Sequence, residues 1–261
     1  MTRPCSNSRF NSILSILAAP FYRASIWQPS ACLLLALCLY VPVLQAEIPL
    51  RAFTATYALK IGGLSPAIAK LSLEPFENMW RWRMITQAKG IYAVFIRKQP
   101  YSETLFKQTA NDPQLQSILI TDDNKDLRQE YASFDWEAGQ MQVLRKGENL
   151  QQPLTEGVYD YQSIHLLAAD MQLREQQSRN LLFYYKGNLV GSELSYVGDE
   201  SVEINGKQTL ARLYLHTFDD SRYELRYYYE ASNPLLPLLI ERLEEDESPS
   251  TLTLQKVDWR S

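Results

Sequence analysis

Short runs in which apolar and polar residues alternate, separated by turn residues, constrain the fold of this chain more than any other feature. Each run is about 5–10 residues long, the usual length of a β-strand. Asn205-Gly206, between two alternating runs, is the strongest hairpin signal in the chain. The spacing predicts antiparallel strands joined by tight turns. The turn signals are Gly62-Gly63, Asp122–Lys125, Glu137–Gly139, Gly187-Asn188, Asn205-Gly206 and Asp219–Ser221.

The alternation assigns side chains to the two faces of these strands. Trp80, Trp82 and Met84 are predicted to face the interior, because burying Arg81 or Arg83 without a partner costs several kcal/mol. One face of a later run is likewise aromatic and apolar, with Tyr223, Leu225, Tyr227 and Tyr229.

In the run before that one, the apolar face is predicted to hold Ala211, Leu213 and Leu215, and the polar face Arg212, Tyr214 and His216. Strands with one polar face suit a curled sheet. We therefore predict a mostly β fold, a single antiparallel curved sheet or a partly open β-barrel with its apolar face inside.

Two stretches indicate helix. Asp160 is a candidate cap for one main amphipathic helix at about 160–175, where apolar residues recur at helical spacing. The segment Gly90–Ile96 fits either a short helix or a strand. The acidic run at 241–247 is predicted to form a loop between the last two strands.

The N-terminal segment resembles an export signal. Basic residues precede an apolar run at 31–44, which is shorter than the roughly 20 residues that span a bilayer. Pro42 and Ala46 lie where a signal helix ends and is cleaved. We expect 1–46 to be a signal peptide, 47–261 to be one β-rich domain in the periplasm, and membrane contact to be limited to the signal before cleavage. An uncleaved N-terminal anchor is the alternative.

The segment after residue 46 excludes several kinds of chemistry. All three cysteines lie within the first 38 residues, so 47–261 has neither disulfides nor thiols. It carries 23 basic and 30 acidic side chains, a formal charge of −7, which argues against nucleic acid as a partner. We expect no cofactor.

Catalytic and metal-binding residues are not indicated by any motif. His165 and His216 lack metal-ligand spacing and are expected to be ordinary surface or boundary histidines. Asp160, Ser163 and His165 could be considered a triad, but a helix places them on different faces. The acidic turn Asp122–Asp126 lacks the glycine and the closing glutamate of a calcium loop. We therefore assign neither catalytic residues nor a metal site.

Aromatic residues are the one positive signal for function. The chain has 16 Tyr, 9 Phe and 5 Trp, many of them on apolar strand faces. They either fill a core or line a groove for an apolar or amphiphilic ligand. The candidate ligand-binding residues are Trp80, Trp82, Tyr92, Tyr227 and Tyr229.

The order of segments resembles a bacterial exported family called domain of unknown function 3108. The stretch at 57–75, YALKIGGLSPAIAKLSLEP, is similar to its opening strands, and TEGVYDYQSIHLLAADMQLR at 155–174 to its helix. The stretch at 193–217 resembles its late hairpin, and those at 235–246 and 251–257 its C-terminal strands. The resemblance covers nearly all of 50–258. It implies an exported, mostly β protein and supplies no catalytic residues.

Three functions remain open from the sequence. The favoured one is a non-enzymatic binding module for a lipid or another envelope component. A hydrolase of envelope material would need facing carboxylates, or a histidine beside a carboxylate, in a cleft. A structural partner of an envelope protein would instead present an exposed apolar patch or edge strand.

Export is directly testable. We expect the mature protein to begin at or near Glu47 and to be released with the periplasmic contents, because the apolar run is shorter than a bilayer-spanning helix and the rest of the chain is acidic and free of cysteine. N-terminal sequencing of the periplasmic fraction measures this. Recovery of only full-length chain in the membrane fraction would contradict it.

Overall fold

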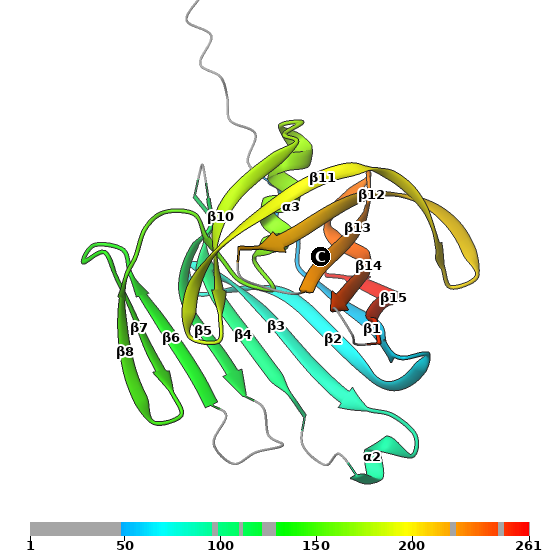
Figure 1. Ribbon diagram of the computed structural model, residues 1–261, viewed down its shortest axis with the longest axis horizontal. Helices are drawn as coiled ribbons and strands as arrows, with labels where there is room; N and C mark the ends of the chain where they lie inside the picture. The colour runs from blue at the N-terminus through cyan, green and yellow to red at the C-terminus, as the bar shows by residue number, and fades with distance from the viewer. Residues whose placement is uncertain are drawn as a thin grey trace, which may run out of the picture. The chain divides into compact units, whose positions relative to one another are not determined.

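Fifteen strands form one open, curved sheet in the computed structural model (Figure 1). The structure describes residues 48–95, 99–109, 112–121, 129–219, 223–244 and 248–260. The predicted signal peptide at 1–46 and the acidic turn at 122–126 lie outside them. Neighbouring strands pair in the order β8-β7-β6-β5-β4-β3-β2-β1-β15-β14-β13-β12-β11-β10-β9, so β8 and β9 are the edges.

The first half of the sheet is a meander. Its strands are β1 (Phe53–Ile61), β2 (Leu64–Phe76), β3 (Met79–Ala88), β4 (Tyr101–Lys107), β5 (Gln114–Thr121), β6 (Gln129–Asp135), β7 (Gln140–Arg145) and β8 (Glu148–Pro153). The one-turn helix α2 (Tyr92–Phe95) lies between β3 and β4, which settles the ambiguous segment Gly90–Ile96 as helical over part of its length.

The second half follows a helix. The elements are β9 (Val158–Tyr159), α3 (Ile164–Leu173), β10 (Ser178–Tyr185), β11 (Asn188–Ile204), β12 (Lys207–Phe218), β13 (Tyr223–Glu230), β14 (Asn233–Glu244) and β15 (Ser250–Trp259). All strand pairs are antiparallel except β9 with β10. β15 pairs with β1 and joins the two halves. The predicted hairpin at Asn205-Gly206 connects β11 to β12.

Helix α3 lies inside the curve of the sheet (Figure 1). Ile164–Met171 are all buried, with Leu166 and Ala169 in one apolar cluster and Leu167 and Met171 in another. The helix is therefore shorter than the predicted 160–175 and is buried on every side over most of its length. Neither helix of the described residues is long and apolar enough to cross a bilayer.

The turn before α3 uses the predicted aspartate. A carboxylate oxygen of Asp160 accepts hydrogen bonds from the backbone N–H of Gln162 at 3.2 Å and of Ser163 at 2.7 Å. The Ser163 hydroxyl also donates to Asp160 at 2.6 Å. Asp160 thus fixes the turn at 161–163, and α3 begins one turn later than predicted.

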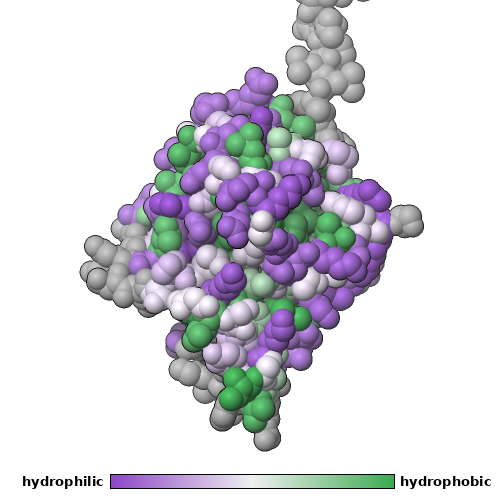
Figure 2. All heavy atoms as spheres, turned by 90° about the vertical axis from the view of Figure 1, so that its right-hand side faces the viewer, coloured by the Kyte–Doolittle hydropathy of each residue, from purple (hydrophilic) through white to green (hydrophobic). Residues whose placement is uncertain are grey.

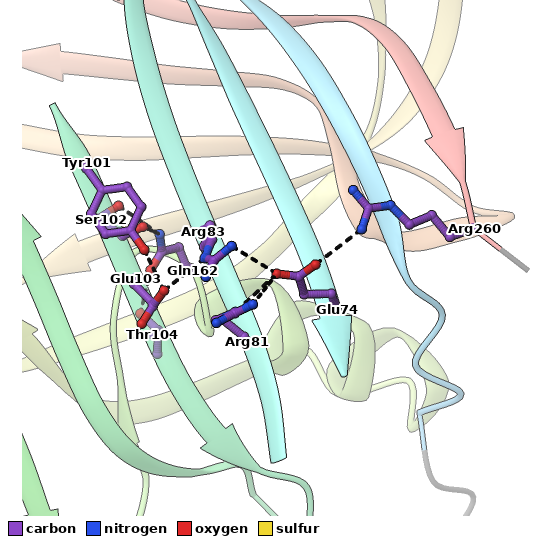
Figure 3. A network of polar contacts seen from close by, with 9 residues as sticks. All are labelled: Glu74, Arg81, Arg83, Tyr101, Ser102, Glu103, Thr104, Gln162 and Arg260. Atoms are coloured by element: carbon purple, nitrogen blue, oxygen red, sulfur yellow. Dashed lines mark hydrogen bonds and ion pairs between the residues drawn. The ribbon is translucent and has the colours of Figure 1, made fainter. Parts of the chain in front are cut away.

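The predicted faces of β3 are confirmed. Trp82 is fully buried, and Trp80 and Met84 pack against the same cluster from partly buried positions. On the outer face, Arg81 and Arg83 form ion pairs with Glu74 at 2.7 and 3.2 Å (Figure 3). The arginines therefore lie opposite the core with carboxylate partners.

The predicted faces of β12 are wrong. Tyr214 and His216 are buried on the inner side, where Tyr214 belongs to the cluster around α3. Ala211 and Leu213 pack on the outer side with Tyr228 of β13. Side chains pack on both faces of this strand, so the alternation of apolar and polar residues does not identify its inner face.

β14 separates from β15 over part of its length. The two strands pair only where Leu239–Arg242 lie beside Ser250–Thr253. Pro234 and Pro237 lie in the part of β14 that does not pair with β15, and proline lacks the N–H that a central strand donates to both neighbours. The Tyr57 hydroxyl donates to the Pro237 carbonyl at 2.9 Å instead. Glu241–Glu244 also belong to β14, which corrects the predicted loop over these residues; 245–247 lie outside the described residues.

The surface is mainly hydrophilic on the face seen in Figure 2, with separate hydrophobic patches. Exposed apolar residues include Ile91 and Val94 beside and within α2, which are 69% and 67% exposed.

Trp82 should dominate the stability of β3. Trp82→Ala is expected to lower the free energy of unfolding by about 3–5 kcal/mol, because the removed ring leaves a cavity. The matched variant Trp80→Ala, on the same face but only partly buried, should cost less. Urea unfolding of both variants measures the difference, and equal losses would contradict the assigned burial.

Candidate functional site

A half-enclosed pocket lies on the inner face of the sheet beside the start of α3. We call it the inner pocket; its cavity volume is about 350 Å³, within the roughly 300–1,000 Å³ usual for small-molecule sites. Six strands that are consecutive in the sheet, from β3 through β2, β1, β15 and β14 to β13, contribute to its wall. The described lining residues are Tyr57, Leu59, Ala69, Leu71, Met84, Tyr161, Gln162, His165, Leu225, Tyr227, Ile240, Arg242, Ser250, Thr251 and Leu252.

The inner pocket is mostly apolar because its strands turn their apolar face inward. Leu59, Leu71 and Leu225 come from three different strands and meet there only because the sheet curls. Its cationic residue, Arg242, is already paired, with Nη2 2.5 Å from a carboxylate oxygen of Glu244. Arg242 also lies over the ring of Tyr223 at 4.8 Å.

The end of the pocket at α3 is held by buried hydrogen bonds. The amide of Gln162 donates to the Ser102 hydroxyl at 2.8 Å, and the Thr104 hydroxyl contacts the side-chain oxygens of Gln162 and Asp160 (Figure 3 labels Ser102, Thr104 and Gln162). These contacts join the turn before α3 to β4. They therefore fix the position of the pocket wall at this end.

Both histidines are fully buried, which corrects their predicted surface or boundary placement. Nδ1 of His165 lies 2.7 Å from the Tyr229 hydroxyl, and Nε2 of His216 lies 3.0 Å from the Ser192 hydroxyl. Burial lowers the pKa of each histidine to about 3, so both are neutral in the folded chain at neutral pH.

The three members of the considered triad do not assemble. Asp160 and Ser163 bond to each other in the turn before α3, whereas His165 bonds to Tyr229. No group of three or more His, Cys, Asp or Glu side chains that could hold a metal ion occurs in the part of the chain that the structure describes.

The predicted ligand-binding residues fall in different places. Tyr227 lines the inner pocket. Trp82 and Tyr229 are fully buried beside it, and both rings contact that of His165 at about 6 Å. Trp80 packs at the edge of a core cluster, and Tyr92 lies in α2, outside the lining. Of the five residues, the structure therefore brings Tyr227 to the pocket wall.

Most residues of the inner-pocket lining are not among those predicted from the sequence. Leu225 shares a strand face with Tyr227, so the alternation of β13 could have identified it. Tyr161 and Gln162 lie in the turn before α3, where nothing in the sequence marks an inward direction. Arg242 lies in the segment predicted as a loop, which the structure shows to be the end of β14.

A second pocket adjoins the first. We call it the turn pocket, because it lies between the β7–β8 turn and the β10–β11 turn; its cavity volume is about 440 Å³. Tyr161 belongs to the walls of both pockets. The described lining residues are Ile120, Gln129, Glu130, Arg145, Lys146, Tyr161, Tyr184, Tyr185 and Lys186.

Comparison with known proteins identifies the family. Residues 53–254 match the family described as Protein of unknown function (DUF3108). The chain belongs to this family. The match confirms the resemblance noted in the sequence, and no curated protein matches the chain.

A solved structure supports the fold of this family member. A β-barrel-like protein of domain of unknown function DUF1849 from Brucella abortus aligns with a TM-score of 0.56 at 12% identity, over 82% of this chain and 100% of that one. A Bacteroides fragilis protein with a YmcC-like fold aligns at 8% identity with a TM-score of 0.31, over 81% and 98%. The first likeness agrees with the predicted mostly β, partly open barrel.

Removing the Tyr227 hydroxyl and removing the Tyr229 hydroxyl should have different effects on the stability of the protein. The buried Tyr227 hydroxyl has no hydrogen-bond partner among the described residues, so Tyr227→Phe should leave stability unchanged or raise it. Tyr229→Phe removes the partner of His165 and should cost about 1–3 kcal/mol. Thermal and urea unfolding compare the pair, and a larger loss for Tyr227→Phe would contradict these assignments.

Proposed function

We propose that the protein is a non-enzymatic binding module of the periplasm that holds an apolar or amphiphilic envelope molecule in the inner pocket. The observation that carries the proposal is the pocket itself, a half-enclosed apolar cavity of about 350 Å³ on the inner face of a folded sheet. A cavity of this size and lining suits an acyl chain or another extended apolar group, whose burial is favourable by about 25 cal/mol per Å².

The pocket wall supports selective binding of apolar groups. Leucine, isoleucine and methionine side chains from six strands face it, and its polar residues are largely bonded within the protein. When an apolar ligand binds, few polar side chains of the wall therefore lose a hydrogen bond to water without gaining another partner. The Tyr227 ring adds a large rigid surface to the wall.

The arrangement of titratable groups favours binding over hydrolysis. A hydrolase needs a base that ionises near its working pH, beside a nucleophile or a positioned water. His165 borders the inner pocket, but burial lowers its pKa to about 3 and its Nδ1 contacts a tyrosine hydroxyl. His216 has the same lowered pKa and contacts Ser192.

One observation favours the alternative of a structural partner in the envelope. Ile91 and Val94, beside and within α2, are highly exposed apolar residues, and they lie outside the lining of the inner pocket. They provide a control, because Ile91→Ser with Val94→Ser should reduce association with an envelope protein but not binding of a small apolar molecule.

The proposal is tested by filling the pocket. The uncharged fluorescent probe N-phenyl-1-naphthylamine should bind the purified protein saturably. Leu59→Trp places a larger side chain in the partly buried wall and should weaken binding at least about tenfold, because it removes space for the probe. The matched variant Leu210→Trp, at a residue that is 66% exposed, should bind like the wild type.

Circular dichroism and urea unfolding of both variants separate lost binding from lost fold. Absence of saturable binding to the wild type, or equal binding by wild type and a folded Leu59→Trp variant, would contradict the proposal.

A further inference from the structure

The turn pocket is built where two distant hairpins meet. The β7–β8 turn is Lys146-Gly147 and the β10–β11 turn is Lys186-Gly187, and all four residues have positive φ, from 50° to 83°. A Cβ atom added to Gly187 would lie 3.0 Å from Cδ of Arg145, so the second turn approaches the end of β7 closely.

A further side chain fixes the two hairpins to each other. The amide of Gln152 in β8 donates to the Gly187 carbonyl at 2.9 Å, and its side-chain oxygen accepts from the Leu189 backbone at 3.3 Å. The two lysines are therefore held near each other by the curl of the sheet, although 40 positions separate them in the sequence.

The turn pocket is cationic in an acidic protein. Its described lining residues include three basic side chains and one acidic, a formal charge of +2, whereas the whole chain carries −4. Glu130 is occupied: it pairs with Arg145 at 2.7 Å and accepts from the Tyr184 hydroxyl at 2.8 Å. Lys146 and Lys186 have no ion pair with a carboxylate in the part of the chain that the structure describes. The residual charge thus belongs to the two lysines.

Tyr161 connects this charge to the apolar cavity. Its ring lies 6.4 Å from that of Tyr185 in the turn pocket, and its hydroxyl lies 3.3 Å from that of Tyr223, next to Arg242 of the inner pocket. Tyr161 is 41% exposed and lines both pockets. A molecule passing over Tyr161 would have an apolar wall at one end and two ammonium groups at the other.

We infer that the ligand is an anionic amphiphile, whose carboxylate or phosphate group binds between Lys146 and Lys186 while its apolar chain crosses Tyr161 into the inner pocket. This inference rests on the proposed function and adds the charge of the ligand to it. Arg242 is excluded as the main anion site because it is paired with Glu244. Cationic groups beside an apolar cavity select against neutral chains of equal length by charge complementarity.

The experiment compares ligands that differ only in the head group. Hexadecanoate and hexadecanol displace N-phenyl-1-naphthylamine from the wild type, from Lys146→Gln with Lys186→Gln, and from Lys60→Gln with Lys207→Gln. The last variant makes the same charge change at two exposed lysines outside both pockets. Inorganic phosphate, as a probe without a chain, is tested as a competitor.

We expect the wild type to bind hexadecanoate about tenfold more tightly than hexadecanol. The Lys146/Lys186 variant should lose this preference while it keeps its affinity for hexadecanol, and the Lys60/Lys207 variant should retain the preference. Added salt should narrow the wild-type preference, because both lysines are exposed.

Three results would overturn the inference. Equal affinities of the wild type for the two ligands would do so and leave the proposed function standing. A Lys146/Lys186 variant that keeps the preference for hexadecanoate over hexadecanol would also overturn it. This holds even if inorganic phosphate binds at the two lysines, since they would then bind a free anion and not the head group. Absence of binding by both ligands and by the probe would overturn the proposed function as well.

Discussion

An open sheet of fifteen strands can bury its inner face only against something inside its curve, and in this protein that element is α3. The rest of the structure depends on this packing. It explains why Ile164–Met171 are buried on all sides and why the polar residues there are bonded: His165 to Tyr229, and Asp170 to Arg174. Helix α3 has only ten residues and does not cover the whole inner face. The inner pocket is the part of that face beside its first turn.

The local features of the fold could be predicted from the sequence because they depend on neighbours in the chain. Asn205-Gly206 specifies a hairpin by its own backbone preferences, and the period of two sets Trp82 inward and Arg83 outward regardless of the rest of the sheet. The prediction failed for Tyr214 and His216 because β12 has another layer of side chains on each face. A buried histidine that bonds to Ser192 looks polar in the sequence yet belongs to the interior.

The site could be predicted only in part, since its residues come together through the curl. Tyr227 and Tyr229 have the same type, strand and face, yet the hydroxyl of one is held by His165 while the other residue lines the pocket. The difference arises from where α3 begins, which the Asp160 turn determines. In the same way, Lys146 and Lys186 follow ordinary hairpins, and their proximity depends on the contact between Gln152 and the β10–β11 turn. Membership of a family of unknown function assigns none of these roles.

The central claim is that the inner pocket holds an apolar chain in the cell, and mass spectrometry of an organic extract tests it most directly. The protein, purified without detergent from the cells that make it, is extracted beside its Leu59→Trp variant, and extracted compounds are quantified per molecule of protein. The account predicts an acyl-chain compound near one per protein in the wild type and a clear reduction in the folded variant. An extract with no apolar compound from the wild type, or the same amount from both proteins, would contradict it.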